Sequence, residues 1–195
     1  MIHFNIIIIG AGASGLMCAI EAGKRGRRVA VVEHTKHIGA KILISGGGYC
    51  NFTNINASSE NYFSENPHFC KSALSRYSPD DFIHFLKKHD IGVREKKDGQ
   101  MFSVKSAKEI VSALISECKS VGVKFLTETK IQSVDKVDDS FVVKINKSLL
   151  QGSSIVVASG GVSFPELGAT NFGHKIAKQF GIRTTPLSPA LTNFT

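Results

Sequence analysis

The sequence predicts an α/β fold with a parallel sheet, flanking helices and a small antiparallel β-meander. An apolar run at residues 5–9 is followed by a glycine-rich turn and then by helix-forming residues 16–22, which is the order strand, loop, helix. A second apolar run at residues 154–158 ends in small residues. Between the two runs, residues 123–145 alternate with the period of two that is typical of strands. The carboxyl ends of the two apolar strands are therefore expected to share one ligand site.

The turn after the first strand is Gly10-Ala11-Gly12-Ala13-Ser14-Gly15. Gly10 permits a tight turn, Gly12 lacks the side chain that would keep a pyrophosphate from the backbone, and Gly15 lets the helix approach the sheet. The N–H groups and the dipole at a helix start favour an anion, and the Ser14 hydroxyl adds a donor. Placed between a strand and a helix, the motif predicts a Rossmann-like, FAD- or NAD(P)-binding fold. A glycine turn without a ligand is the alternative.

The second strand, residues 28–32, ends in Glu33. An acidic residue about 20 positions after the first glycine accepts hydrogen bonds from ribose hydroxyls. Its negative charge also repels a 2′-phosphate. The first nucleotide site is therefore expected to hold FAD or NAD rather than NADP.

Three consecutive glycines follow in Ser45-Gly46-Gly47-Gly48. They permit the backbone to press against a flat or phosphorylated ligand. A flexible hinge explains them equally well from the residues alone. A plain NAD-binding domain would instead show another short strand–helix step at this point.

Two helices have clear start signals. Ser78-Pro79-Asp80-Asp81 combines a capping serine, a proline at the first helical position and acidic residues in the first turn. Ser106-Ala107-Lys108-Glu109 matches a capping box. Residues 53–78 are polar and aperiodic, and we expect a surface excursion there. A helix of about eight residues is expected after Asn171-Phe172-Gly173, ending at Gly181.

Strands are expected at residues 123–126, 131–137 and 141–145, with a hairpin turn at Asp138-Asp139. The strand at residues 154–158 runs into Ser159-Gly160-Gly161. Because it resembles the first strand, its end is expected to reach the same cofactor.

Composition narrows the class of protein. The chain has 195 residues, 42% hydrophobic and 21% charged, enough for one domain and part of a second. No apolar run is long enough to span a membrane, and no secretory signal precedes the first strand, so a cytoplasmic protein without a membrane partner is expected. The net charge of +8 is dispersed and there is no Trp, so no nucleic-acid partner is expected. Four widely spaced cysteines form no C-x-x-C and predict no metal site.

The motifs together resemble those of the BaiN/YhiN-like flavoproteins, a family of FAD-dependent NAD(P) oxidoreductases that includes aminoacetone-oxidase-type proteins. The resemblance covers nearly the whole chain. The matching segments are Gly10 to Gly15, Glu33, Gly39 to Gly48, Cys50 to Asn54, Ala158 to Gly161 with Ser163 and Pro165, Gly168 to Thr170, and Pro186 to Leu191.

The resemblance implies FAD as cofactor and NAD(P)H as a possible electron donor. It implies that Gly10 to Gly15 hold the pyrophosphate, that Glu33 holds the adenosine ribose, and that the Ile131 backbone meets adenine. It also implies that Ser45 to Gly48 and Asn51 approach the flavin and that Ser159 to Gly161 close over the cofactor. The implied cofactor-binding residues are Gly10, Gly12, Ala13, Ser14, Gly15, Glu33, Lys41, Ser45, Gly46, Gly47, Gly48, Asn51, Ile131, Ser159, Gly160 and Gly161.

The chain also departs from the family pattern. Tyr49 stands where the family has Arg, and Gly99-Gln100-Met101-Phe102-Ser103 replaces Gly-Arg-Val-Phe-Pro. Neither the catalytic residues nor the small-molecule substrate can be assigned, and Cys50 is more simply a packing residue.

Family members are longer. Residues 1–185 are therefore expected to form a FAD-binding Rossmann-like domain, discontinuous in the family, whose C-terminal part is absent here. Residues 186–195 would begin a missing middle domain. Three interpretations stay open: a truncated FAD-binding part of an oxidoreductase, an NAD-binding dehydrogenase domain, and a non-catalytic remnant. A chain without its closing segment is expected to expose apolar surface and to self-associate.

Overall fold

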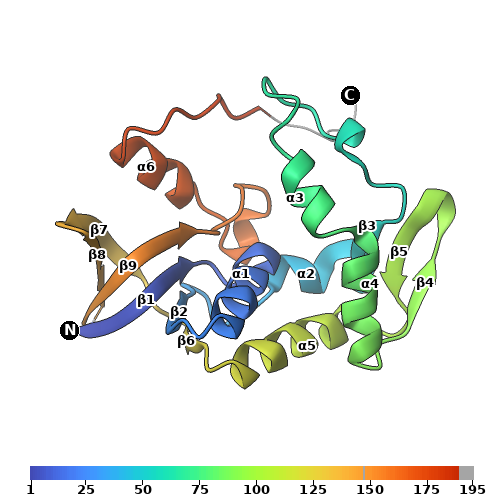
Figure 1. Cartoon of the computed structure of the whole chain (residues 1–195), viewed down its shortest axis with the longest axis horizontal. Coiled ribbons are helices and arrows are strands. Elements are labelled where there is room, and N and C mark those ends of the chain that lie inside the picture. The colour runs from blue at the N-terminus through green and yellow to red at the C-terminus, as the bar shows by residue number, and fades with distance from the viewer. Residues whose placement is uncertain (147, 189–195) are drawn as a thin grey trace.

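The computed structural model describes residues 1–146 and 148–188. Its helices and strands are mixed along the whole chain, and the described strands form two separate sheets (Figure 1). The strands are β1 (Ile2–Ile9), β2 (Val29–Val32), β3 (Asn51–Asn54), β4 (Val93–Glu95), β5 (Gln100–Ser103), β6 (Lys124–Leu126), β7 (Ile131–Val137), β8 (Ser140–Ile145) and β9 (Leu149–Val157).

The helices are α1 (Ala13–Lys24), α2 (Ala40–Ile44), α3 (Lys71–Arg76), α4 (Pro79–Lys88), α5 (Ala107–Ser120) and α6 (Phe172–Gln179). Short 3-10 helices are η1 (Ser45–Gly48), η2 (Ser59–Asn61), η3 (Lys97–Gly99) and η4 (Pro165–Leu167). Among the described residues, none of these helices is long and apolar enough to cross a membrane.

In the described part of the chain, the main sheet has the strand order β6-β2-β1-β9-β8-β7. Strands β6, β2, β1 and β9 are parallel, whereas β7, β8 and the first half of β9 form an antiparallel meander. The α/β fold, its parallel sheet and its meander are therefore confirmed. Strand β9 begins five residues earlier than the apolar run at residues 154–158 predicts, because its first half pairs with β8 through a more polar segment.

Alternate side chains of β1 belong to two separate cores. Ile8 packs with α1 and α5 through Leu16, Ile20 and Leu114, all fully or almost fully buried. Ile7 and Ile9 pack on the other side with the meander and with Ile176 of α6. Because successive strand residues point to opposite faces, the four consecutive isoleucines, Ile6 to Ile9, fill both cores and fix β1 in the middle of the sheet.

A second sheet, of three strands in the described residues, has the order β3-β5-β4 and is antiparallel throughout. In Figure 1 it lies on the right, with α1, α2 and α5 between it and the main sheet. This sheet was not predicted from the sequence, because its strands are only three or four residues long and show no clear alternation. The predicted surface excursion at residues 53–78 is corrected in part, since it contains η2 and α3.

The start of α4 is as predicted. Ser78 Oγ accepts a hydrogen bond from the Asp81 N–H, Asp81 Oδ2 accepts from the Ser78 N–H, and Pro79 is the first helical residue. This reciprocal pair satisfies two N–H groups that a helix start would otherwise leave without acceptors.

The predicted capping box at Ser106 is wrong. Helix α5 does begin after Ser106, but in the described structure its side chain makes no capping bond. The fully buried Ser103 replaces it: Ser103 Oγ accepts from the Ser106 N–H at 3.2 Å and lies 3.0 Å from the Ser106 carbonyl oxygen. Helix α6 likewise begins at Phe172 rather than after Gly173. The domain boundary expected at residue 186 stays a prediction. Of the segment 186–195 that would begin the next domain, residues 189–195 lie outside the described residues.

Candidate functional site

The glycine turn after β1 has the geometry that its spacing predicts. Gly10 has a φ of 109°, and a Cβ there would overlap the carbonyl oxygen of Ala158 at the end of β9. A Cβ on Gly15 would overlap the carbonyl oxygen of Gly10. Only glycine fits at either position, so the turn holds the start of α1 against the carboxyl ends of two parallel strands.

Gly12 differs from its two neighbouring glycines. Its backbone is extended, and no atom of the described residues lies within 4 Å of the position that a Cβ would occupy. It precedes the first turn of α1, where no side chain caps the helix and no acidic residue is present. The space above Gly12 is therefore open, and it faces backbone N–H groups and the positive end of the helix dipole.

Glu33 is anchored at the end of β2. One carboxylate oxygen accepts from the Ala11 N–H at 3.0 Å, and the other accepts from the Thr35 N–H and hydroxyl at 2.9 and 3.0 Å. The side chain is 11% exposed, and His34 Nδ1 lies 3.1 Å from the second oxygen. The carboxylate is thus held in one orientation beside the glycine turn.

A cleft of about 470 Å³ crosses the start of α1. It joins residues that are far apart in the sequence, from the glycine turn, the end of β2, α2, β3 and the loop after β9. Ten of the predicted site residues line it: Gly10, Gly12, Ala13, Ser14, Glu33, Lys41, Ser45, Asn51, Ser159 and Gly160.

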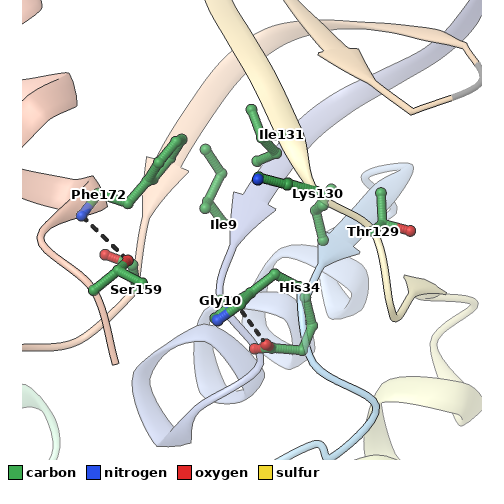
Figure 2. A pocket seen from close by; sticks show the side chains of 11 residues that line it. Ile9, Gly10, His34, Thr129, Lys130, Ile131, Ser159 and Phe172 are labelled. Atoms are coloured by element: carbon green, nitrogen blue, oxygen red, sulfur yellow. Dashed lines mark hydrogen bonds and ion pairs between the residues drawn. The ribbon is translucent and has the colours of Figure 1, made fainter. Parts of the chain in front are cut away.

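A second pocket of about 430 Å³ shares Gly10, Glu33, His34 and Ser159 with this cleft. Its remaining lining is mainly apolar and includes Ile131. Figure 2 shows Ile9 and Ile131 from two strands of the sheet, Phe172 and Ser159 to one side, and Gly10 with His34 below. The cleft and the second pocket thus meet at the glycine turn and form one elongated depression.

Lys41 links two walls of the cleft. Its Nζ donates to the carbonyl oxygen of Gly161 at 2.9 Å, which ties α2 to the loop after β9. Gly160, with a φ of 72°, lies next to that ammonium group. Gly161 is held by this contact without lining either pocket.

The three glycines of η1 lie at the edge of the cleft rather than in its lining. Gly46, Gly47 and Gly48 all have positive φ. A Cβ on Gly46 would come within 2.7 Å of both the Asn51 N atom and the Phe102 ring, so this glycine serves a tight backbone turn. Gly15 likewise lies beneath the cleft and does not line it.

Sequence reasoning missed several lining residues on loops. His34 Nε2 lies 2.7 Å from the Gly168 carbonyl oxygen, so this side chain bridges Glu33 and the loop that contains η4. Thr35 and Lys130 also line the depression. Adjacency to Glu33 was the available signal for His34 and Thr35, whereas Gly168 is brought close only by the fold.

Cys50 and Cys118 are buried among apolar side chains. Burial raises the pKa of the Cys50 thiol, against a smaller opposing effect of the Ser45 hydroxyl. Burial also raises the pKa of Cys118 to about 12, with the nearby Glu117 carboxylate adding to the shift. Both therefore remain thiols at neutral pH and fit packing roles.

Comparison with known proteins gives close relatives over the whole chain. The chain is 46% identical over 195 residues to the ribosomal RNA dihydrouridine synthase of Escherichia coli K12, covering 100% of this chain and 49% of that protein. It is 28% identical over 191 residues to the 3-dehydro-bile acid delta(4,6)-reductase of Clostridium scindens, covering 96% of this chain and 46% of that protein. The chain thus spans about half the length of the curated relatives it matches.

Among solved structures, the fold resembles glycine oxidase from Geobacillus kaustophilus, with a TM-score of 0.60 at 18% identity over 87% of this chain and 58% of that one. This likeness shows the fold alone. Residues 4–189 match the HI0933-like protein Rossmann domain. The chain therefore belongs to the HI0933-like Rossmann-domain family, a family of FAD-dependent oxidoreductases.

Proposed function

We propose that this chain is the FAD-binding part of a flavoprotein that uses NAD(P)H to reduce a carbon–carbon double bond, and that the whole protein acts on uridine in ribosomal RNA. The observation that carries the cofactor proposal is the elongated depression over the start of α1. It runs from Ile131, past Glu33 and the open space above Gly12, to Asn51.

The residues present fit an extended dinucleotide. The uncapped start of α1 offers N–H groups to a diphosphate, and Gly12 leaves space for it. The fixed carboxylate of Glu33 is placed to accept from ribose hydroxyls, and the mainly apolar pocket at Ile131 suits adenine. We assign the opposite end, near Ser45 and Asn51, to the flavin.

The names of the two curated relatives support the reaction class. A dihydrouridine synthase and a delta(4,6)-reductase both carry out reductions that add hydrogen to a double bond. When bound with its flavin near Ser45 and Asn51, FAD would supply hydride-transfer chemistry between NAD(P)H and a double bond, one carbon of which gains the hydride and the other a proton. Uridine in ribosomal RNA is the substrate that the 46% identity favours.

An NAD-binding dehydrogenase domain is a weaker proposal. After β2 the chain enters α2, η1 and the three-stranded sheet, instead of a further strand–helix step of the main sheet. Ser45, at the start of η1, and Asn51, at the start of β3, belong to this departure, and both line the cleft.

The cofactor proposal is tested by the visible absorption spectrum of the chain after incubation with FAD and desalting. We expect flavin bands to remain with the wild type and to bleach on anaerobic addition of NADH or NADPH. A folded wild-type chain that retains no flavin, or that binds NADH more tightly than FAD, would contradict the proposal.

Two glycine variants locate the site. Gly12→Ala should fold normally, because its Cβ meets no atom of the described protein, but should raise the dissociation constant for FAD about tenfold or more by occupying the pyrophosphate space. Gly122→Ala is the matched control. Its φ of 75° makes alanine cost about 1 kcal/mol of stability, and it lies outside both pockets, so FAD affinity should not change. Equal FAD affinity of the two variants would place the cofactor elsewhere.

A further inference from the structure

We infer that one face of the three-stranded sheet, together with Tyr49, is a docking surface for single-stranded RNA beside the cofactor cleft. The inference rests on the proposed function, since it gives the RNA substrate a place to bind. We call this surface the β4 face; it consists of Tyr49, Arg94 and Lys96, with the buried Phe102 ring beneath Lys96.

Two cations, one on β4 and one directly after it, lie over aromatic rings. The Arg94 guanidinium carbon is 5.0 Å from the centroid of the Tyr49 ring, and Lys96 Nζ is 4.2 Å from the centroid of the Phe102 ring. Arg94 lies on β4, and Lys96 directly follows the last residue of that strand. Its backbone is still extended, and its N–H donates to the Gln100 carbonyl oxygen at 2.8 Å, so both side chains point to the same face of the sheet. Each aromatic ring thus holds a cation in place without neutralising it.

The β4 face is accessible and keeps its positive charge. Tyr49 is 41% exposed, and Arg94 and Lys96 are exposed. Among residues 1–146 and 148–188, no carboxylate lies within ion-pair distance of either cation. Asp98, the acidic residue at the hairpin tip, is 3.9 Å from Lys97 instead. Glu95 lies between the two cations in sequence and therefore points to the opposite face.

The position of the β4 face relates it to the cleft. Tyr49 follows η1 directly, and its carbonyl oxygen accepts from the Ser103 N–H of β5 at 2.9 Å. Its neighbour Cys50 and the first residue of η1, Ser45, both line the cleft. A chain of nucleotides lying on the β4 face would therefore pass the end of the cleft that we assign to the flavin.

The chemistry of the surface favours single-stranded RNA. Exposed aromatic rings and guanidinium planes stack on unpaired bases, while ammonium and guanidinium N–H groups bind phosphates. A duplex offers its phosphates but keeps its bases stacked inside. Tyr49 therefore predicts a preference for single strands that a purely basic patch would not have.

The test measures binding of a fluorescent single-stranded RNA of about 12 nucleotides, rich in uridine, to the FAD-loaded chain over a range of salt concentrations. The double variant Arg94→Gln/Lys96→Gln should raise the dissociation constant about tenfold and reduce the slope of log K against log salt by about 1.4, which is two phosphate contacts. Tyr49→Ala should weaken single-strand binding about tenfold. It should change binding of the corresponding duplex little.

The matched control is Lys119→Gln/Lys124→Gln. It removes the same charge at the end of α5 and on β6, away from the three-stranded sheet (Figure 1). The affinity of this control variant for the single-stranded RNA should fall much less than that of Arg94→Gln/Lys96→Gln. Equal loss in both double variants would overturn the inference, as would equal affinity of wild type and Tyr49→Ala. FAD retention by every variant shows that the cofactor site is intact. If the wild type retains FAD but does not bind the RNA, the result counts against the β4 face alone. If the wild type does not retain FAD, the result counts against the proposed function.

Discussion

At the scale of single residues, the three glycines of the first turn have three different physical roles. Gly10 and Gly15 are required by the protein itself, because a Cβ at either position would overlap backbone oxygen. Gly12 meets nothing in the described structure, so the protein alone gives no reason for glycine there. That contrast separates a residue that shapes the turn from one that leaves space for a ligand.

This contrast predicts that alanine lowers the stability of the protein at position 15 but not at position 12. Gly15→Ala should lower the free energy of unfolding by about 2 kcal/mol, because the new methyl group displaces the Gly10 carbonyl. Gly12→Ala should leave that free energy within about 0.5 kcal/mol of the wild type. Urea denaturation followed by circular dichroism measures both, and equal stabilities would contradict the packing argument.

Thiol reactivity tests the cysteine assignments. Because burial raises the pKa of Cys118 to about 12, its thiol stays protonated at pH 8. Cys50 and Cys18 also have raised pKa values because of burial. The native chain should therefore react slowly with a disulfide reagent, and all four thiols should react quickly in urea. Fast labelling of Cys50 in the native protein would reopen a catalytic role for it.

At the scale of elements, two helices with similar start signals behave differently. Ser78→Ala should cost about 1 kcal/mol, because its hydroxyl accepts from the Asp81 N–H. Ser106→Ala should cost little, because its side chain caps nothing in the described structure. Ser103→Ala should be the more damaging change at α5, since it removes a buried hydroxyl that bonds the Ser106 N–H. Urea midpoints of the three variants rank these contributions.

The pH dependence of the α4 cap follows from Asp81. Hydrogen bonds from the Ser78 backbone and hydroxyl lower the pKa of this carboxyl from its ordinary 3.8. A lowered folded-state pKa gives stability that is present above the ordinary value and is lost as pH falls through the folded value. The stability difference between wild type and Asp81→Asn should therefore be constant near pH 7 and shrink below about pH 4. If the stability difference between wild type and Asp81→Asn stayed unchanged down to pH 2, the ionised Asp81 carboxylate would not be what stabilises the start of α4.

At the scale of the whole molecule, β9 pairs with its two neighbouring strands over different lengths. It pairs with β1 along almost its full length, but with β8 only from Leu149 to Gly152. Within the described ranges, no other strand occupies the remaining edge. Ser153, Ser154 and Val157 are exposed along this edge, which is an available site for pairing with another chain.

This edge gives the expected self-association a location. Wild-type chain should form dimers or larger species at high concentration, measured by size-exclusion chromatography with light scattering. Ser154→Lys should reduce that association, because a charged edge residue opposes strand pairing. Ser112→Lys on the exposed side of α5 is the matched control and should not reduce it. A wild type that stays monomeric at all concentrations would contradict the prediction.

The sequence by itself determined the α/β class, the central strand, the glycine turn and the position of Glu33. These features depend on local patterns: an apolar run, glycine spacing and residues next to a strand end. The three-stranded sheet could not be predicted in the same way, because strands of three or four residues carry too little periodicity and are defined by their partners.

Only the tertiary structure decided which distant residues meet. It joined Ile131 to the glycine turn in one depression, left Gly46 to Gly48 at the margin of the cleft, and brought His34 to Gly168. It also placed Arg94 over Tyr49, a pairing of residues 45 positions apart that the dispersed charge of the sequence does not indicate. Such contacts arise from the packing of elements across a sheet and between sheets, and packing is specified by the whole chain rather than by any local stretch.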